Sequence, residues 1–381
     1  MCKTLERMVN DRLVHVLKSR NCCQMYSAVS GRTIAHWTTW SDWKRLLKRP
    51  SPGKKQVLAV FFDLEKAYDT TWRFSVSKTT CVHFHRQRIY TEPALHLDGQ
   101  PIPVKGEAMF LGVVFDSKLN FSSHVKYLKK KCLKALNLLR VVGHTDWGAD
   151  RATLLKLYRT LVRSKLDYGS VIYGSAKKHV LKALDPIHHH GLRIALGAFR
   201  TTPLKSLYAE AGEPSLEHRR MKLAFNYVLK LKSLPRNPCY EAVFETPLSD
   251  SSTVTNYINS VWQKNWDAEG ANKLHEVLPN LGEDLHRRGE GGGRKQETAM
   301  CRLRVGHTWL TQSFLLKNEK QPFCYACDSL NTVRHILIEC PDFQDTRRKY
   351  FSVTDMYRFF REVNPSRIVG YLKDLGVYGK I

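Results

Sequence analysis

The stretch VLAVFFDLEKAYDTTW, residues 57–72, decides the fold of the first part of the chain. It begins with six consecutive apolar residues, Val57 to Phe62. An apolar run without alternation is typical of a central strand that is buried on both faces. The run ends at Asp63, and a carboxylate at the carboxyl end of such a strand lies at the rim where open α/β sheets bind ligands. Alternatively, Asp63 only turns the chain before a helix that starts near Leu64, because aspartate is a common turn former.

The residues that follow make this pattern more specific. Tyr68 comes five residues after Asp63, and Asp69 and Trp72 follow it. The stretch FFDLEKAYDTTW resembles the first palm motif of reverse transcriptases from non-LTR (LINE-type) retrotransposons, especially those of arthropods. In that family the first aspartate binds the catalytic Mg²⁺ ions, and the aromatic residue discriminates against the 2′-hydroxyl of the incoming nucleotide. The resemblance therefore implies a catalytic, magnesium-binding role for Asp63 and a nucleotide-binding role for Tyr68.

The composition indicates a polyanionic partner. The chain has 381 residues, enough for two or three domains, and its 61 Lys and Arg against 35 Asp and Glu give a net charge of +26. Such an excess favours nucleic acid over a membrane as the partner. No secretory signal or apolar run of membrane-spanning length is present. The ten cysteines are scattered, which favours a reducing, intracellular compartment, cytoplasm or nucleus.

The family resemblance is interrupted on both sides of this stretch. Residues 1–20 form an amphipathic pattern that resembles a fingers helix of the same polymerases. Residues 21–56 lack the family's Gly-Phe-Arg-containing fingers motif and show no regular period, so we expect a loop, as a shifted reading frame would produce. After Trp72 the chain skips to a segment that resembles a later palm motif, in which Lys78 matches a lysine that protonates the leaving pyrophosphate. No Asp-Asp pair occurs anywhere in the sequence, although the family carries one in its palm.

The end of the palm-like region carries two further strand signals. Asp98-Gly99 lies between alternating apolar residues and predicts a hairpin. The stretch MFLGVVFD, Met109 to Asp116, is predicted as a strand and resembles the primer-grip hairpin that ends the palm. Asp116 could pair with Asp63 in an accidental metal site, but we favour a turn function for it.

Helical patterns dominate from about residue 120 to residue 244. Between Val125 and Arg140 one face is apolar, and much of the rest carries Lys126, Lys129, Lys130 and Lys134. These lysines are either a solvated face or a surface that follows nucleic-acid phosphates. A second helix, 150–166, is predicted to bury Leu154, Leu157, Tyr158 and Leu161. His188, His189 and His190 are a weak metal candidate, since adjacent residues on a helix point in different directions.

The last strong signal is a set of metal ligands. Cys324-x2-Cys327-x7-His335-x4-Cys340 has spacing suited to tetrahedral Zn²⁺, and we favour zinc over a small core of reduced side chains. The segment resembles the C-terminal zinc knuckle of LINE-type polyproteins, including the preceding RLRVGHTWLT and the following ECPDF. Before it, RRGEGGGRK at 287–295 reads as a flexible linker.

The predicted fold is α+β. It comprises a reverse-transcriptase palm remnant with few strands, a helical thumb region and a small C-terminal zinc-binding module. The expected segments are a fingers helix remnant at 1–20, an unmatched loop at 21–56, a truncated palm at 57–119, a helical thumb and connection at 120–245, an RNase H tail remnant with a linker at 246–293, the zinc knuckle module at 294–350 and C-terminal helices at 351–381.

The sequence predicts a transposon-derived fragment of an RNA-directed DNA polymerase, a nucleotidyltransferase, that binds nucleic acid without catalysis. Its expected partners are RNA and RNA–DNA or DNA duplexes, and its expected cofactor is Zn²⁺, with Mg²⁺ implied only by the family. One alternative is an active RNA-directed DNA polymerase, which the missing Asp-Asp pair disfavours. Another is a protein-interaction module built on the zinc end, which the +26 charge disfavours. The sequence does not indicate the oligomeric state.

Overall fold

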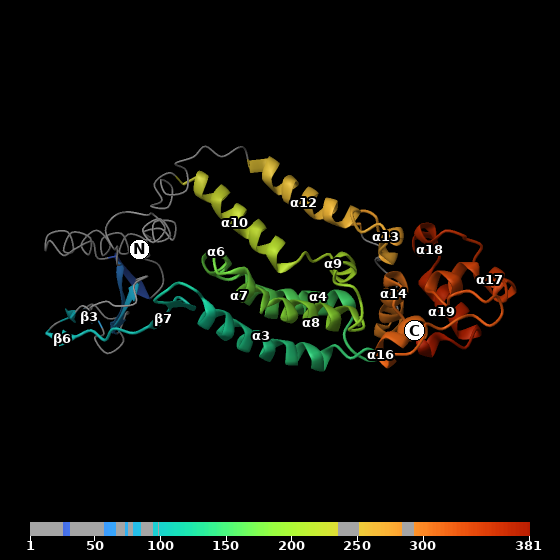
Figure 1. Ribbon diagram of the computed structural model, residues 1–381, viewed down its shortest axis with the longest axis horizontal. Helices are drawn as coiled ribbons and strands as arrows, with labels where there is room; N and C mark the ends of the chain where they lie inside the picture. Colours follow the sequence, from blue (N-terminus) through green and yellow to red (C-terminus); the bar gives the residue numbers. More distant parts are fainter. Residues whose placement is uncertain are drawn as a thin grey trace. The chain divides into compact units, whose positions relative to one another are not determined.

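The chain is mostly helical with a few short strands in the computed structural model (Figure 1). The structure describes residues 26–30, 57–65, 73–74, 79–84, 94–97, 99–234, 251–283 and 293–381. Two compact units are present: the first comprises Met1–Tyr127, Gly169–Leu181 and Leu223–Ser251, and the second comprises Leu128–Tyr168, Lys182–Lys222 and Ser252–Ile381. All of the described strands lie in the first unit, whereas the second is built from helices. No described helix has both the length and the apolar character needed to cross a membrane.

The central strand of the first unit is β2, Val57–Glu65. It pairs in parallel with β1, Tyr26–Ser30, and antiparallel with β4, Thr80–Phe84. The predicted central strand is therefore present, but the expectation of a loop over 21–56 is wrong at β1, because five of its residues pair with β2. That pairing joins segments about thirty residues apart, which local periodicity cannot detect.

Strand β2 also continues beyond the position where we expected it to end. Asp63 pairs with Ser30, and the next two residues pair antiparallel with the short strand β3, Arg73–Phe74. Leu64 is therefore extended, and the alternative of a helix starting near Leu64 is wrong. Asp63 lies within the strand rather than at its carboxyl end, since the ladder with β3 keeps the backbone extended.

Two hairpins follow in the first unit. Strands β5, His96–Leu97, and β6, Gln100–Pro101, pair across the predicted Asp98-Gly99 turn. The predicted single strand over 109–116 is instead a hairpin of β7, Glu107–Phe110, and β8, Val113–Asp116. Its turn residues, Leu111 and Gly112, have φ values of 46° and 76°. Positive φ at both central residues is the geometry of a type I′ turn. Leucine rarely adopts a positive φ, so the sequence did not predict a turn at this position.

Helix α3, Ser122–Val142, has the buried face that the sequence predicts. The residues of that face are all fully or nearly fully buried: Val125, Leu128, Cys132, Leu136 and Leu139. Their spacing of three and four residues places them on one side of a helix, and this side contacts the core while the opposite side faces solvent.

The second predicted helix is present, and two of its four predicted core residues, Leu154 and Tyr158, are buried. It consists of α4, Arg151–Tyr158, a π-helical turn over Arg159–Arg163 and α5, Ser164–Asp167. Its buried residues are Leu154, Leu155, Tyr158, Val162 and Leu166, and all but Leu155 recur at intervals of four. Leu157 and Leu161 are only partly buried, so their predicted core positions are wrong. The wider π-helical turn accounts for Leu161, which lies within it, because the turn shifts the buried position to Val162.

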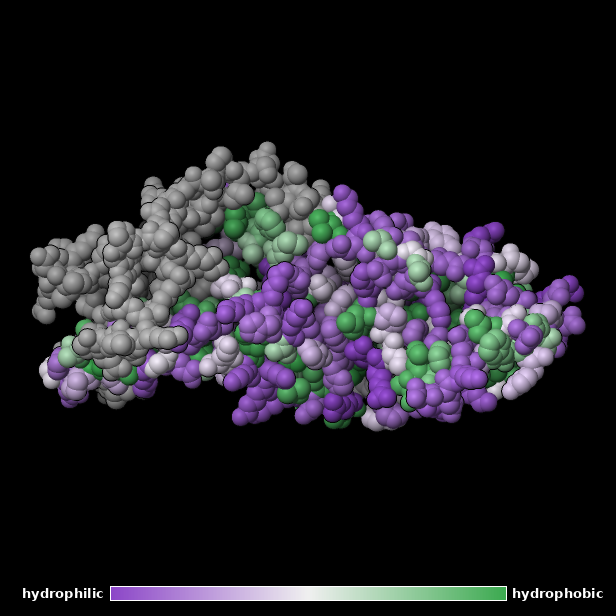
Figure 2. All heavy atoms as spheres, viewed as in Figure 1, coloured by the Kyte–Doolittle hydropathy of each residue, from purple (hydrophilic) through white to green (hydrophobic). Residues whose placement is uncertain are grey.

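The remaining helices complete both units. In order they are α6 Ser170–Tyr173, α7 Lys178–Lys182, α8 Asp185–Leu196, α9 Leu204–Ala211, α10 Leu216–Lys232, α12 Ser251–Asp267, α13 Lys273–Val277, α14 Arg294–Val305, α15 Trp309–Gln312, α16 Phe314–Lys317, a π-helical turn His335–Glu339, α17 Gln344–Tyr350, α18 Met356–Glu362, α19 Pro365–Asp374 and a 3₁₀ turn Tyr378–Lys380. Figure 2 shows hydrophilic side chains over much of the described helical surface, with smaller hydrophobic areas between them.

Helix α14 is held against earlier helices by buried arginines. Arg294, its first residue, donates to the carbonyl oxygens of Ile194 and Ala195 on α8, each at 2.8 Å. Arg304 forms a buried ion pair with Glu210 on α9. The predicted linker at 287–295 lies mostly outside the described residues, but its last two residues belong to α14 rather than to a flexible segment.

Candidate metal centre and basic helix

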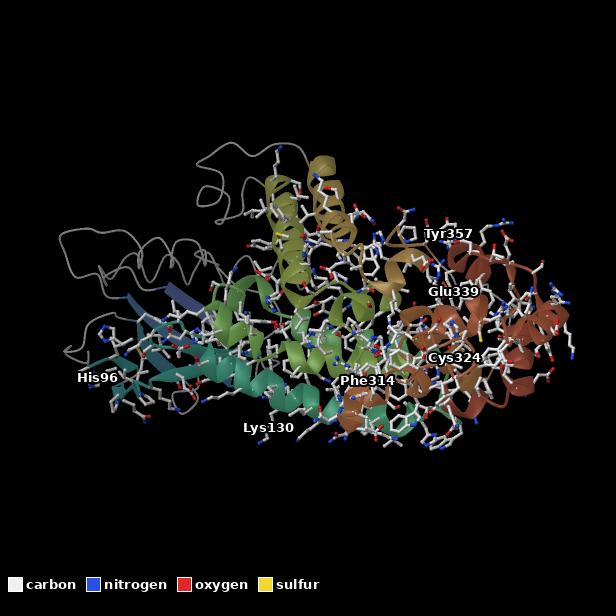
Figure 3. All side chains as sticks on the ribbon, turned by 45° about the vertical axis from the view of Figure 1, so that its right-hand side comes forward. His96, Lys130, Phe314, Cys324, Glu339 and Tyr357 are labelled. Carbon is white, nitrogen blue, oxygen red and sulfur yellow. The ribbon has the colours of Figure 1, made fainter. Side chains whose placement is uncertain are left out.

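Four side chains near the carboxyl end converge to form a group that could hold a metal ion. The Sγ atoms of Cys324, Cys327 and Cys340 and a ring nitrogen of His335 all lie within 4.8 Å of one another. Three thiols and one imidazole are the ligand types that zinc prefers. Figure 3 labels Cys324 among the C-terminal helices of the second unit.

The distances between these ligand atoms fit one tetrahedral ion. Cys324 Sγ lies 3.8 Å from Cys340 Sγ, and Cys327 Sγ lies 3.3 Å from His335 Nε2. Ligands at ordinary Zn–S and Zn–N bond lengths are about 3.8 Å apart for two sulfurs and about 3.5 Å apart for sulfur and nitrogen at tetrahedral angles. The separation of Cys324 and Cys340 is also far longer than a disulfide bond. The residues present therefore fit a four-coordinate zinc ion.

A short turn positions the first two ligands. The backbone N–H of Cys324 donates to the carbonyl of Ser329 at 2.8 Å, and Phe323 pairs with Leu330 in an isolated bridge. Asp328 adopts a left-handed conformation with φ of 49°, which reverses the chain directly after Cys327. This reversal places the two thiols on the same side of the turn, as a two-residue spacing between metal ligands requires.

The other two ligands come from the following helical turn. Thr332 Oγ1 accepts the backbone N–H of His335 at 3.0 Å and so caps this turn. The backbone N–H of Cys340 donates to the His335 carbonyl at 2.8 Å, which ends the turn at the fourth ligand. His335 and Cys340 are both buried, whereas Cys324 and Cys327 are half-buried.

The C-terminal helices fix this turn from behind. Arg347 on α17 donates to the Cys340 carbonyl at 2.8 Å, and the Tyr371 hydroxyl on α19 donates to the Ile336 carbonyl at 2.7 Å. Sequence reasoning missed both residues, because neither belongs to the ligand pattern. The amphipathic pattern of residues 354–381 predicts helices there, but a pattern of this kind cannot show which carbonyl groups a side chain contacts.

The chemistry of the thiols suits metal binding. Hydrogen bonding from His335, and then from the backbone N–H of Ala326, lowers the pKa of the Cys324 thiol to about 6. Burial raises the pKa of Cys340 above its ordinary value. A thiolate is the metal-binding form of cysteine, so the lowered pKa of Cys324 favours metal binding, whereas Cys340 would have to lose its proton when a metal binds.

The second feature is the solvent-facing side of α3. Lys126, Lys129, Lys130 and Lys134 are all exposed, opposite the buried apolar face. Figure 3 shows Lys130 pointing outward from the helix. Lys126, Lys130 and Lys134 follow one another at intervals of four residues, so they form a row along one side of the helix. Lys131 is a fifth exposed lysine that the sequence analysis did not include.

The predicted polymerase residues stay a prediction, because the structure does not describe their side chains. Asp63 lies on β2, and only its backbone position is described; Tyr68 and Lys78 lie outside the described residues. The Asp116 carboxylate accepts the backbone N–H groups of Asn120 at 3.0 Å and Phe121 at 2.7 Å, which confirms its predicted turn function.

The three adjacent histidines are structural. The Nδ1 atom of His188 lies 2.5 Å from the Tyr158 hydroxyl, and its Nε2 atom donates to the Pro214 carbonyl at 3.1 Å. His189 contacts the Tyr208 hydroxyl, and Arg140 contacts His190. Burial lowers the pKa of His188 to about 3, so it stays neutral in the core of the second unit. The three rings point to different partners, in agreement with the weak metal prediction.

Comparison with curated proteins shows a distant homology to non-LTR retrotransposon Pol polyproteins. The chain is 24% identical over 263 residues to the "Retrovirus-related Pol polyprotein from type-1 retrotransposable element R1 4" of Nasonia vitripennis, which covers 66% of the chain and 65% of the relative. It is 26% identical over 292 residues to the corresponding R1 polyprotein of Bradysia coprophila, which covers 72% of the chain but 28% of the relative.

The chain is also similar over a shorter stretch to a transposon polymerase. The "Probable RNA-directed DNA polymerase from transposon X-element" of Drosophila melanogaster is 27% identical over 128 residues, or 32% of the chain and 13% of the relative. No family model matches the chain. No solved structure matches it. The chain therefore spans less than two thirds of the length of each of these three relatives.

Proposed function

We propose that this chain is a nucleic-acid-binding protein derived from a retrotransposon reverse transcriptase, that it is stabilised by one zinc ion, and that it does not polymerise DNA. In this proposal the sheet around β2 is a palm remnant, and the helices from α3 onward correspond to the thumb and connection. The observation that carries the proposal is the exposed lysine face of α3 on a chain with a net charge of +26.

The lysine face supports binding to the phosphate backbone. Lys126, Lys129, Lys130 and Lys134 present four cationic groups on one helix whose opposite side is buried, so the helix cannot rotate them away from a ligand. Binding of this kind is mostly electrostatic and tolerates different sequences. We therefore expect affinity for RNA and for RNA–DNA or DNA duplexes that falls steeply as salt is added.

The zinc ion has a structural role in this proposal. Cys324, Cys327, His335 and Cys340 would occupy all four positions of a tetrahedral ion, which leaves no open site for a substrate or a reactive water. Zinc would instead fix the turn at 324–327 to the helical turn at 335–339 and hence to α17 and α19. Its contribution is folding free energy.

Polymerase activity is not expected from the residues present. Two-metal phosphoryl transfer needs several carboxylates a few ångströms apart, which hold two Mg²⁺ ions against the primer hydroxyl and the triphosphate. The chain retains Asp63 but has no Asp-Asp pair in its sequence. Asp116 is no substitute, because its carboxylate is occupied by backbone N–H groups. Positioning supplies most of the catalysis in phosphoryl transfer, and one carboxylate cannot provide it.

The test measures binding and chemistry on the same purified chain. Fluorescence anisotropy with a labelled RNA–DNA duplex should show salt-sensitive binding, while primer extension on an RNA template with Mg²⁺ or Mn²⁺ should give only background product. Extension that disappears on Asp63→Ala would overturn the proposed lack of catalysis. An absence of duplex binding at low salt would overturn the proposed binding function.

A further inference from the structure

The loop after α3 presents an exposed tryptophan. The Trp147 side chain is 70% exposed, although large aromatic residues are usually mostly buried in folded proteins. Its indole ring stacks on the imidazole of His144, with ring centroids 4.9 Å apart and an interplanar angle of 14°. One face of the indole is therefore covered by His144, and the exposure of the side chain leaves ring surface open to a ligand.

The backbone holds this ring pair in a fixed turn. The backbone N–H of Asp146 donates to His144 Nδ1 at 3.2 Å, and that of Gly148 donates to the His144 carbonyl at 3.1 Å. The N–H of Ala149 closes the turn onto the Val142 carbonyl at 2.9 Å. A Cβ atom at Gly148 would lie only 2.3 Å from the His144 carbonyl oxygen, so this close approach requires glycine.

Cationic and aromatic side chains from two distant segments lie beside the turn. Lys295 at the start of α14 places its Nζ atom 4.0 Å from Asp146 Oδ1 and 5.7 Å from the centre of the Tyr378 ring. Lys373 on α19 places its Nζ atom 5.7 Å from the centre of the same ring. Both lysines are exposed, and Asp146 is the acidic group in ion-pair contact with Lys295.

Together with Asp146, which joins the turn to Lys295, these side chains form the Trp147 patch of the second unit: His144, Asp146, Trp147, Lys295, Lys373 and Tyr378. It lies where the carboxyl end of α3, the start of α14 and the C-terminus meet (Figure 1). The patch combines flat rings with cations, and such rings stack on nucleobases while the cations attract phosphates.

We propose that the Trp147 patch binds single-stranded nucleic acid, with a base stacked on Trp147 and its neighbouring phosphates held by Lys295 and Lys373. This inference rests on the proposed nucleic-acid-binding function, and it adds that the ligand at the carboxyl end of α3 is a single strand. A single strand is favoured over a duplex because bases within a duplex are already covered by their neighbours on both faces. The positive charge favours nucleic acid over an apolar protein surface.

The exposed lysines of α3 lie on the helix that ends directly before the Trp147 turn. From Lys130 to Val142 the helix advances about 18 Å, at about 1.5 Å per residue. This length suits a strand of a few nucleotides, within the site sizes of about 4–16 nucleotides that single-strand binding domains use. In this proposal Lys129, Lys130 and Lys134 would contact the phosphates, and Trp147 would stack a base beyond the carboxyl end of α3.

The experiment compares two ligands of equal charge on the full chain. One is a fluorescein-labelled oligothymidylate of about 12 nucleotides, and the other is an abasic strand of the same length. Trp147→Ala should weaken oligothymidylate binding about tenfold or more and leave abasic binding unchanged, because only the base can stack. Trp147→Phe should restore most of the affinity. Trp309→Ala is the matched control, since Trp309 is 42% exposed and also has a lysine, Lys317, over its ring.

The outcomes separate this inference from the proposed function. If the wild-type chain binds neither strand but binds an RNA–DNA duplex, only the Trp147 patch is refuted. If it binds none of these three ligands at low salt, the proposed function fails as well. In a second outcome, binding depends on salt and is weakened when Lys129, Lys130 and Lys134 are all changed to glutamine. If Trp147→Ala then binds both strands like the wild type, only the Trp147 patch is refuted. A third outcome is that Trp147→Ala binds both strands like the wild type but loses a self-association that the wild type shows. This outcome would assign the patch to contact between copies of the chain and would overturn the proposal of single-strand binding. Circular dichroism of each variant verifies that it is folded.

Discussion

Neutralising Glu210 should destabilise the second unit strongly. The Arg304 and Glu210 side chains are only 4% and 2% exposed, and Arg304 Nε and Nη2 lie 3.1 Å and 2.5 Å from Glu210 Oε1. Glu210→Gln keeps the size of the side chain but removes the counter-charge that Glu210 places against the buried Arg304 cation. Breaking a buried pair in this way costs about 3–5 kcal/mol. For a unit of this size, each kcal/mol lowers Tm by about 2–4 °C, so we expect a decrease of about 6–20 °C.

Thermal unfolding by circular dichroism measures this decrease, with two comparison variants. Glu269→Gln is the matched control, because Glu269 pairs with Lys205 in an ion pair whose side chains are 32% and 53% exposed. An exposed pair of this kind contributes at most about 1 kcal/mol. The double variant Glu210→Leu with Arg304→Met should recover most of the lost stability, since it removes both charges.

Two results would refute this reasoning. One is a Glu210→Gln variant that loses no more stability than Glu269→Gln. The other is a double variant that is as unstable as Glu210→Gln alone, which would show that packing rather than charge dominates at this position.

Three further predictions concern the metal centre and the core. The purified chain should contain about one equivalent of zinc by elemental analysis, and Cys327→Ala should contain less than about half an equivalent. Cys301→Ala is the control and should match the wild type, whereas equal zinc content in all three chains would exclude the predicted ligands. His188 should account for about 2 kcal/mol of a fall in the free energy of unfolding between pH 8 and pH 5, because the unfolded chain protonates it below its ordinary pKa of 6.5 while burial holds the folded pKa near 3. Burial also lowers the pKa values of His124, His189 and His307 to about 4, so these groups add to the total fall. Chemical denaturation across this range should show a flatter profile for His188→Gln, and an equal slope would contradict the assignment. Gly191→Ala should lower the free energy of unfolding by about 1–3 kcal/mol in the same assay, because its Cβ atom would lie 2.6 Å from the Tyr158 ring. An unchanged free energy of unfolding would show that this ring can move.

The sequence predicted those features that depend on local spacing. The buried face of α3 follows from apolar residues at intervals of three and four, and all five of its predicted members are buried. The Cys and His ligands come together because their spacing allows a short turn and a following helical turn to meet. Both features are encoded within about twenty residues, so the periodicity and the motif were sufficient.

Features that depend on distant contacts or unusual backbone geometry were not predictable in this way. Strand β1 forms by pairing with β2, and the π-helical turn at 159–163 buries Val162 in place of the predicted Leu161. The Glu210–Arg304 pair joins residues that are 94 positions apart and that individually resemble surface charges. Trp147 was equally inconspicuous in sequence, because its exposure depends on a turn that Gly148 permits.

The salt dependence of duplex binding tests the central claim most directly. The observed binding constant for an RNA–DNA duplex should be measured across a range of salt concentrations for three chains. They are the wild type, a variant with Lys126, Lys129, Lys130 and Lys134 changed to glutamine, and a control with four other exposed lysines changed: Lys177, Lys182, Lys320 and Lys349.

The slope of log K against log salt falls by about 0.9 for each phosphate contact removed from a duplex. If all four lysines of α3 contact phosphates, their replacement should reduce the slope by up to about 3.6, whereas the control should keep the wild-type slope. Equal slopes in the α3 variant and the wild type would contradict the assignment of binding to α3.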